Sequence, residues 1–350
     1  MNPSQKFSTQ LLQWWDTHGR KDLPWQHNPT PYRVWISEIM LQQTQVSTVI
    51  PYYERFMEAF PTLEDLAHAP TDQVLHHWTG LGYYARARNI HKTAQYCVEN
   101  HHGQLPDSAE LLTGLPGIGR STAAAIVSFA FGQSAAILDG NVKRVLARVF
   151  GIKDWPGKPS TQAQLWTISH SHTPDERCAD YNQAMMDFGA TFCTRSKPQC
   201  HTCPFQPTCV AYTTDQVTAI PGKKPKKSIP VVAVSMVVIR DCAQHLYLEQ
   251  RPKEGIWGGL YSFPECPDHE AVLSRYAHLN LATEVTLGDT LMHKFTHRTL
   301  LIQPVFLQLT NELPTIDTQS GYWTSTGDAL AQLGLPAPIK RLIQSLQDEK

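Results

Sequence analysis

Apolar residues recur at three- and four-residue spacing over residues 8–212, which is the periodicity of helices that bury one face. Thr30 followed by Pro31 predicts a helix with an N-cap and a first-turn proline, and Thr62 with Asp65 has the form of a capping box. The same spacing predicts further helices over residues 72–79, 84–100, 120–131, 141–150, 161–170 and 178–190. We therefore expect an all-α body of roughly ten helices.

The pattern changes after a short basic stretch broken by prolines, Pro221–Lys227, which is typical of an exposed linker. The segments that favour strands beyond it are residues 231–239, 246–250, 284–292 and 299–309, and a last helix is expected over 337–347. The sequence thus predicts an all-α domain over residues 1–220, a linker over 221–230 and an α+β domain over 231–350.

The chain has 350 residues, 41% apolar and 17% charged, a composition that excludes a disordered or fibrous protein. The formal net charge of −1 gives no argument for a nucleic acid, membrane or acidic partner. The two halves differ, because residues 1–227 carry 21 Lys and Arg against 18 Asp and Glu, whereas residues 228–350 carry 9 against 13. Any surface that binds nucleic acid must therefore be local.

The cysteines provide the first candidate chemistry. No apolar run approaches the length of a membrane span and the first residues lack a secretory pattern, so we expect a cytoplasmic protein with reduced thiols. Four of the eight cysteines form the loop Cys193-x6-Cys200-x2-Cys203-x5-Cys209. Four thiolates suit either tetrahedral zinc or a 4Fe-4S cluster, although zinc usually uses two CxxC-like pairs and only one is present.

A second motif is the glycine turn within Leu115–Thr122, where Gly117 and Gly119 precede an apolar helix. Such a turn lets backbone N–H groups and a helix N-terminus bind a phosphate, but it also arises where helices pack closely.

A third candidate is a pair of carboxyl groups. Glu38 lies among apolar residues of a predicted helix, which should raise its pKa and favour a protonated acid. Asp139 lies at the predicted start of another helix, where amide donors should favour the ionised form. One protonated and one charged carboxyl is the combination that breaks a glycosidic bond.

Taken in order, the hairpin, Asp139 and the cysteine loop resemble the helix-hairpin-helix DNA glycosylases of the endonuclease III superfamily. The helix Ser37–Val46 is nearly the signature of the MutY-type adenine DNA glycosylases, and Leu23–Trp25, Gly80–Asn89 and Leu138–Arg144 are similar to that family too. The resemblance implies one 4Fe-4S cluster on the four cysteines. It also implies a monofunctional DNA repair hydrolase that flips adenine out of double-stranded DNA, opposite 8-oxoguanine or guanine, and leaves an abasic site.

The resemblance also implies roles for individual residues. Glu38 would protonate N7 of the adenine, and Asp139 would stabilise the positive sugar. The residues implied in the adenine pocket and in DNA binding are Trp25, Gln26, Gln43, Thr44, Leu81, Gly82, Tyr83, Gly117, Gly119, Ser121 and Asn141. Tyr83 would insert beside the orphaned base. A positive strip is expected from Arg86, Arg88, Arg120, Lys143, Arg195 and Lys197.

The α+β domain resembles the Nudix-like fold, through Gln250–Pro252 and Gly255–Pro264. Residues 265–280 lack the clustered glutamates that hold magnesium in working Nudix hydrolases, so no hydrolase activity is expected. Phe295, Thr296 and His297 correspond to the family's Phe-Ser-His loop and would read 8-oxoguanine.

Two alternatives remain open at this point. An endonuclease III-like glycosylase and lyase for oxidised pyrimidines would need a lysine where this chain has Ser121. A non-catalytic iron–sulfur DNA binder or redox sensor would not require both Glu38 and Asp139. We expect a monomer with DNA as its partner and no membrane association.

Overall fold

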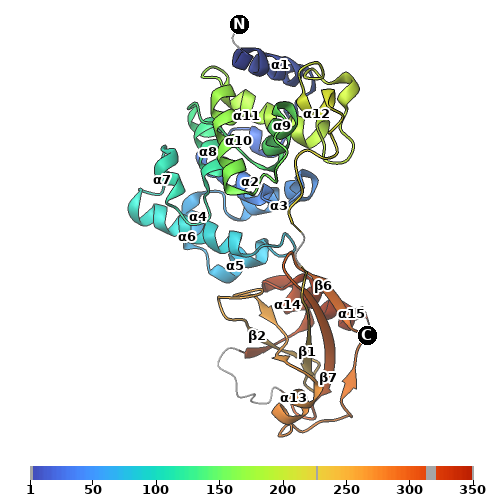
Figure 1. Cartoon of the computed structure of the whole chain (residues 1–350). Coiled ribbons are helices and arrows are strands. Elements are labelled where there is room, and N and C mark those ends of the chain that lie inside the picture. The colour runs from blue at the N-terminus through green and yellow to red at the C-terminus, as the bar shows by residue number, and fades with distance from the viewer. Residues whose placement is uncertain (1–2, 226–227, 313–320, 349–350) are drawn as a thin grey trace. The chain divides into compact units, whose positions relative to one another are not determined.

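The computed structural model describes residues 3–225, 228–312 and 321–348, and its elements are drawn in Figure 1. Contacts within the chain define two units. A helical unit comprises Met1–Ala67 and Lys92–Lys226, and a mixed unit comprises His68–His91 and Lys227–Lys350. The predicted order, helical and then α+β, is confirmed. In the described ranges no helix combines the length and the apolar character needed to cross a bilayer.

The helices predicted over residues 120–131, 141–150, 161–170 and 178–190 are present in the helical unit, with ends shifted by at most three residues. The helices of this unit follow in chain order. They are α1 (Pro3–His18), α2 (Pro31–Leu41), α3 (Val46–Ala59), α4 (Leu63–His68), α7 (Ala109–Thr113), α8 (Arg120–Phe131), α9 (Gly140–Phe150), α10 (Pro159–His172), α11 (Cys178–Asp187) and α12 (Val210–Thr213). Thr30 caps α2 by accepting from the Arg33 N–H, and Thr62 and Asp65 form the predicted capping box. A π-helical turn, Phe188–Phe192, extends α11.

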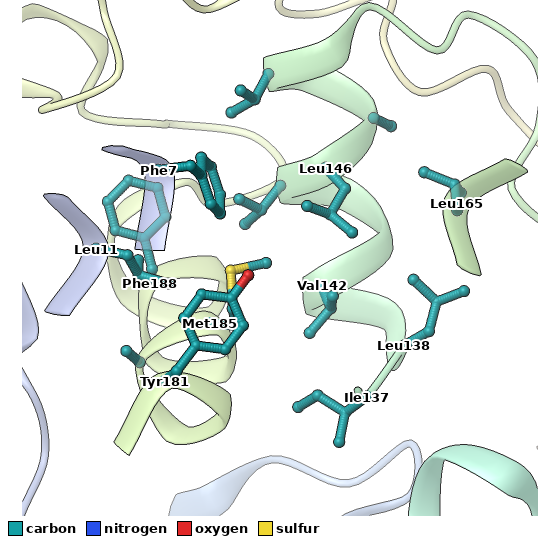
Figure 2. Close-up of a cluster of buried hydrophobic side chains, with 14 of the residues drawn as sticks. Phe7, Leu11, Ile137, Leu138, Val142, Leu146, Leu165, Tyr181, Met185 and Phe188 are labelled. Atoms are coloured by element: carbon teal, nitrogen blue, oxygen red, sulfur yellow. The ribbon is translucent and has the colours of Figure 1, made fainter. Parts of the chain in front are cut away.

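The core of this unit lies between α1, α9, α10 and α11 (Figure 2). Leu11, Leu146 and Leu165 are fully buried, and Tyr181 and Phe188 complete the cluster from α11 and the turn after it. Burial of such side chains contributes roughly 1.5–3 kcal/mol each. This packing holds the start of α9, where Asp139 is the N-cap, against α11.

Side chains from three helices fix the segment that leads into Asp139. Ser169 donates to the carbonyl of Ile137 at 2.7 Å, and Asn182 donates to the carbonyl of Ala135 at 2.8 Å. Ser121 accepts from the Leu138 N–H at 2.9 Å. Because these backbone groups lie outside regular structure, the side chains supply the partners that a helix or strand would otherwise supply.

The mixed unit is built on one sheet. Its strands are β1 (Val231–Arg240), β2 (Leu246–Gln250), β3 (Tyr261–Ser262), β4 (Glu265–Cys266), β5 (Thr286–Leu287), β6 (Leu291–Lys294), β7 (Thr299–Gln308) and β8 (Gly321–Thr324). The main path is β3-β2-β1-β7-β5. β1 and β7 pair in parallel over ten positions, from Val231 with Thr299 to Arg240 with Gln308, and β6 forms an antiparallel hairpin with β7. Helices α13 (His269–Arg275), α14 (Thr326–Gln332) and α15 (Ala337–Asp348) complete the unit.

The mixed unit also includes His68–His91, a grouping that the sequence pattern did not predict. This segment contains α5 (Thr71–His77) and the start of α6 (Ala85–Asn100). Asp72 accepts from Gln250 at 3.0 Å and from Tyr261 at 3.2 Å, and Tyr84 donates to the carbonyl of Leu335. These bonds join residues more than 170 positions apart, so the helical periodicity of the sequence could not predict them.

Candidate active site

Seven of the predicted site residues come together around one cavity of about 420 Å³ in the helical unit. They are Trp25, Glu38, Gln43, Thr44, Ser121, Asp139 and Asn141. We call this space the catalytic cavity. The C-terminal half of α2 and the residues after it form one side, and the starts of α8 and α9 form another. A pocket in which two carboxyl groups converge with several other polar side chains is a typical site for chemistry.

Glu38 has the environment that the sequence predicted. Its neighbours on α2, Ser37 and Ile39, are buried, and its own side chain is only partly accessible. Burial, and then the negative charge of Asp139, raise the pKa of Glu38 to about 8. The carboxyl group is therefore largely protonated at neutral pH, as a general acid requires.

Asp139 caps α9 as predicted. Its Oδ1 accepts from the Val142 N–H at 2.7 Å, and its Oδ2 accepts from the Asn141 side chain at 3.2 Å. Burial nevertheless raises its pKa, so the expectation that these donors would dominate is wrong in direction. Asp139 still ionises before Glu38, because its negative charge is one of the causes that raise the pKa of Glu38.

Asn141 connects Asp139 to the cysteine loop. Its Oδ1 accepts from Arg144 at 2.9 Å, and Arg144 also donates to the carbonyls of Gly189 and Cys193. Arg148, on the same helix, donates to the Cys193 Sγ at 3.4 Å. Two arginines on α9 therefore fix the beginning of the loop.

All four cysteines of the loop are free thiols of intermediate exposure. Burial, and then the charges of the neighbouring thiolates, raise the pKa of Cys203 to about 12. Cys193, Cys203 and Cys209 pack against the core of the helical unit. Among the residues described, no three His, Cys, Asp or Glu side chains gather closely enough to hold a single metal ion.

A second space, which we call the side chamber, adjoins the catalytic cavity. Its volume is about 240 Å³, and it shares Trp25, Glu38 and Gln183 with the cavity. Gln26, predicted in the adenine pocket, lines only this chamber. The amide of Gln26 accepts from the Leu23 N–H and donates to the carbonyl of Arg20, so it braces its own loop.

Sequence reasoning missed a buried carboxylate, Asp187, behind these two spaces. Asp187 is fully buried and accepts from the Trp15 indole at 3.2 Å, from the Arg20 guanidinium at 2.6 and 2.9 Å, and from Gln183 at 2.9 Å. Arg20 and Gln183 both line the catalytic cavity. No local motif marks Asp187, because two of its three side-chain partners lie more than 160 residues away.

The glycine hairpin forms the turn between two helices that the sequence predicted. Gly117 has a φ of +79°, and Gly119 is the N-cap of α8 without any side-chain cap. Helices α7 and α8 flank the turn. Arg120, one position on, stacks on Trp166 at 4.0 Å and contacts the His170 ring at 2.6 Å.

The residues predicted to contact the orphaned base lie in the mixed unit. Tyr83 is 45% exposed with a φ of +52°, between Gly82, which also has positive φ, and α6. Phe295, Thr296 and His297 form the turn between β6 and β7, closed by a bond from the Phe295 N–H to the Arg298 carbonyl.

The positive strip requires a correction. Arg86 is buried and donates to the carbonyls of Leu81 and Gly82. It therefore stabilises the loop that carries Tyr83 and does not contribute to an exposed positive surface. Arg88 donates to the carbonyl of Gly258 at 2.7 Å. Arg195 and Lys197, by contrast, are exposed as expected.

The helical fold, the hairpin and the paired carboxyl groups define a helix-hairpin-helix DNA glycosylase. Residues 36–170 match the HhH-GPD superfamily of base excision DNA repair proteins, and residues 235–345 match the NUDIX domain. The chain is 31% identical to a thermostable thymine-DNA glycosylase structure, with a TM-score of 0.56 over 61% of this chain and 98% of that one. An endonuclease III structure in complex with DNA, 24% identical with a TM-score of 0.53 and the same 61% coverage of this chain, shares the fold.

Relatives that match nearly the whole chain show which family of DNA glycosylases it belongs to. An adenine DNA glycosylase of Buchnera aphidicola subsp. Baizongia pistaciae is 38% identical over 342 residues, covering 97% of each chain. The human adenine DNA glycosylase is 32% identical over 407 residues, covering 98% of this chain and 74% of that one. The protein therefore belongs to the adenine DNA glycosylase family, whose members are monofunctional base excision repair enzymes.

The Asp187 cluster can be tested with Asp187→Asn. The amide keeps the size of the side chain but removes the charge and one acceptor, so Arg20 and Gln183 lose their fixed positions. We expect a loss of about 3 kcal/mol in the free energy of unfolding, typical of breaking a buried ion pair. We also expect base release to slow at least tenfold at a temperature where the variant is fully folded, measured under single-turnover conditions.

The matched control is Asp16→Asn, which removes a surface ion pair with Arg177. That change should alter stability by less than about 1 kcal/mol. Equal effects of the two substitutions would contradict a special role for Asp187.

The raised pKa of Glu38 predicts a pH-dependent stability. The unfolded chain loses this proton near the ordinary pKa of about 4.3, whereas the folded protein keeps it to about 8. This stabilisation is complete below the unfolded pKa and is lost as the pH rises through 8. Urea unfolding at pH 5 and pH 9 should therefore show a smaller fall in stability for Glu38→Gln than for the unchanged protein. Glu58→Gln, at an exposed position of α3, should behave like the unchanged protein.

Proposed function

We propose that this protein excises adenine from A:8-oxoguanine and A:G mispairs in double-stranded DNA by hydrolysing the N-glycosidic bond. The observation that carries the proposal is the pairing of a protonated acid, Glu38, with the earlier-ionising Asp139 across one cavity. Adenine is assigned as the excised base because the chain belongs to the adenine DNA glycosylase family. The mispair preference is our inference from the residues of the mixed unit.

Glu38 acts first. An adenine anion is a poor leaving group, so a proton delivered to N7 lets the base depart neutral. A carboxyl group with a pKa of about 8 is protonated at neutral pH and still releases its proton readily. After the bond breaks, the Glu38 carboxylate can accept a proton from the attacking water.

Asp139 opposes the positive charge that develops on the sugar. The Val142 N–H and the Asn141 amide hold its two oxygens, so the carboxylate does not reorient during the reaction. Ser121 serves the same end indirectly, since it bonds to the backbone of Leu138 just before Asp139. A lysine at this position, as in bifunctional relatives, would lack the acceptor that this bond needs.

The turn Phe295–His297 is proposed to contact 8-oxoguanine, with Tyr83 filling the space beside it. Thr296 and His297 are exposed at the end of the β6–β7 hairpin, and Tyr83 is exposed at the end of its own loop. Both segments belong to the same unit by their contacts. We further propose that residues 1–220, apart from His68–His91, form the catalytic domain, and that residues 231–350 form with that segment a lesion-recognition domain without hydrolase activity.

The cysteine loop is proposed to hold a 4Fe-4S cluster rather than zinc. Four cysteine thiolates are the usual ligands of such a cluster. Four half-buried thiols in one loop, with only one CxxC-like pair among them, fit this donor set. When bound, the cluster would stabilise the loop that carries the exposed Arg195 and Lys197.

The function is tested with a duplex that contains a single adenine opposite 8-oxoguanine, guanine or thymine. Treatment with alkali after incubation reveals the abasic product. We expect product from the first two duplexes and none from the third. The rate should fall as the pH rises above about 8, because Glu38 loses its proton.

The matched variant is Glu38→Gln, which keeps the shape of the side chain but cannot deliver a proton. Base release should fall by at least about 100-fold while duplex binding survives. Equal release by the variant, or equal release from the thymine duplex, would contradict the proposal.

The cluster is tested by measuring bound iron and acid-labile sulfide in purified protein. We expect four of each per chain, the stoichiometry of a 4Fe-4S cluster. Cys200→Ser should lower both, whereas Cys242→Ser, an exposed cysteine outside the loop, should leave both unchanged. Stoichiometric zinc without sulfide would contradict the assignment.

A further inference from the structure

The side chamber shares Glu38 with the catalytic cavity but is not lined by Asp139 or Asn141, which hold the sugar side of the reaction. Its inner end is formed by Glu38 and Ser37, and its outer end includes the exposed residues Lys21 and Pro29. We propose that the side chamber is the exit route of the freed adenine, which leaves through it while the abasic strand still occupies the catalytic cavity. This proposal rests on the excision of adenine proposed above.

The two spaces meet at Glu38, the group that protonates the base. Trp25, Glu38 and Gln183 line both the catalytic cavity and the side chamber, whereas Asp139 and Asn141 line only the cavity. A sugar held beside Asp139 therefore has Glu38 between it and the chamber. A base that Glu38 has just protonated already lies at the entrance of the chamber once its bond to the sugar is gone.

The openings of the two spaces are formed by different parts of the chain. The exposed residues around the catalytic cavity are Gln43, Gly140 and Ala190, at helix ends, whereas the side chamber opens at Lys21 and Pro29. A strand that fills the first opening leaves the second one free. Base and strand can then depart separately and in either order.

The lining of the chamber suits a free purine. Trp15, Trp25 and Phe129 offer flat apolar surface, and the charges of Lys21 and Asp180 have opposite sign. An aromatic, nearly neutral passage admits an uncharged heterocycle more readily than a phosphate or a sugar phosphate. Pockets for drug-sized ligands measure about 300–1,000 Å³, so a chamber of about 240 Å³ matches a smaller molecule such as a single base.

Asp187 stabilises the wall between the two spaces. Its carboxylate bonds to Trp15 in the chamber, to Arg20 in the cavity and to Gln183 in both. Lys21 lies over the Trp15 ring at 5.0 Å and donates to the carbonyl of Asp16, so the outer end of the chamber is braced as well. These bonds keep the chamber open beside a distinct cavity.

The test uses Ala179→Phe, which fills the chamber from α11 without touching the catalytic cavity. A duplex with radiolabelled adenine opposite 8-oxoguanine is mixed with excess protein and sampled over time. Alkali-treated samples report abasic product, and rapid filtration reports label still held by the complex. We expect abasic product to form within about threefold of the normal rate, while release of the label into the filtrate slows at least tenfold.

Ala163→Phe, the same change at an exposed position of α10, is the control and should alter neither rate. Pro29→Trp, at the outer opening, gives a second blocked variant if Ala179→Phe does not fold. Label that leaves the blocked variants at the normal rate overturns the exit route, and so does a loss of abasic product itself, because the base would then need the chamber before bond breaking. Absence of abasic product from the unchanged protein would instead refute the proposed function.

Discussion

Two carboxyl groups that face one partly dry cavity cannot ionise independently, and the chemistry of this enzyme depends on that constraint. Asp139 has backbone and amide donors that oppose the cost of its burial, so it takes the negative charge first. That charge then adds to the desolvation of Glu38 and keeps a proton on it. The division between acid and anion therefore comes from the order of two ionisations. The packing of α2 against α8, and of α9 against α11, maintains the positions of the two carboxyl groups.

Much of the helical unit was predictable because its signals are local. The caps at Thr30, Thr62 and Asp139 each involve residues within three positions, and helical periodicity located the helices between them. Seven of the thirteen residues predicted for catalysis, the adenine pocket and DNA binding line the catalytic cavity. Local signals could not bring them together, since only the resemblance to a family joined α2 to α8 and α9. Where the sequence expectation for Asp139 was wrong, the cause was burial by distant segments, which outweighed the local donors.

Asp187 and the segment His68–His91 show what the sequence could not provide. In the sequence, Asp187 cannot be distinguished from an ordinary helix residue. Its role is visible only in the folded chain, where Arg20 and Trp15, from near the N-terminus, bond to it. Likewise, nothing in the amphipathic pattern of α5 distinguishes contact with other helices from contact with Gln250 and Tyr261. In both cases the partners are polar side chains at long sequence separation, where periodicity holds no information.

The parallel pairing of β1 with β7 has a consequence for how this protein can change. The turn Phe295–His297 directly precedes β7, and ten consecutive positions of β7 are matched to β1. In a strand, inserting or deleting one residue exchanges the inward and outward faces. A length change inside β1 would thus disturb the turn through its partner strand, whereas added residues in the basic segment before β1 leave that register intact. Insertions should therefore be tolerated in the basic segment before β1 but not within β1 itself.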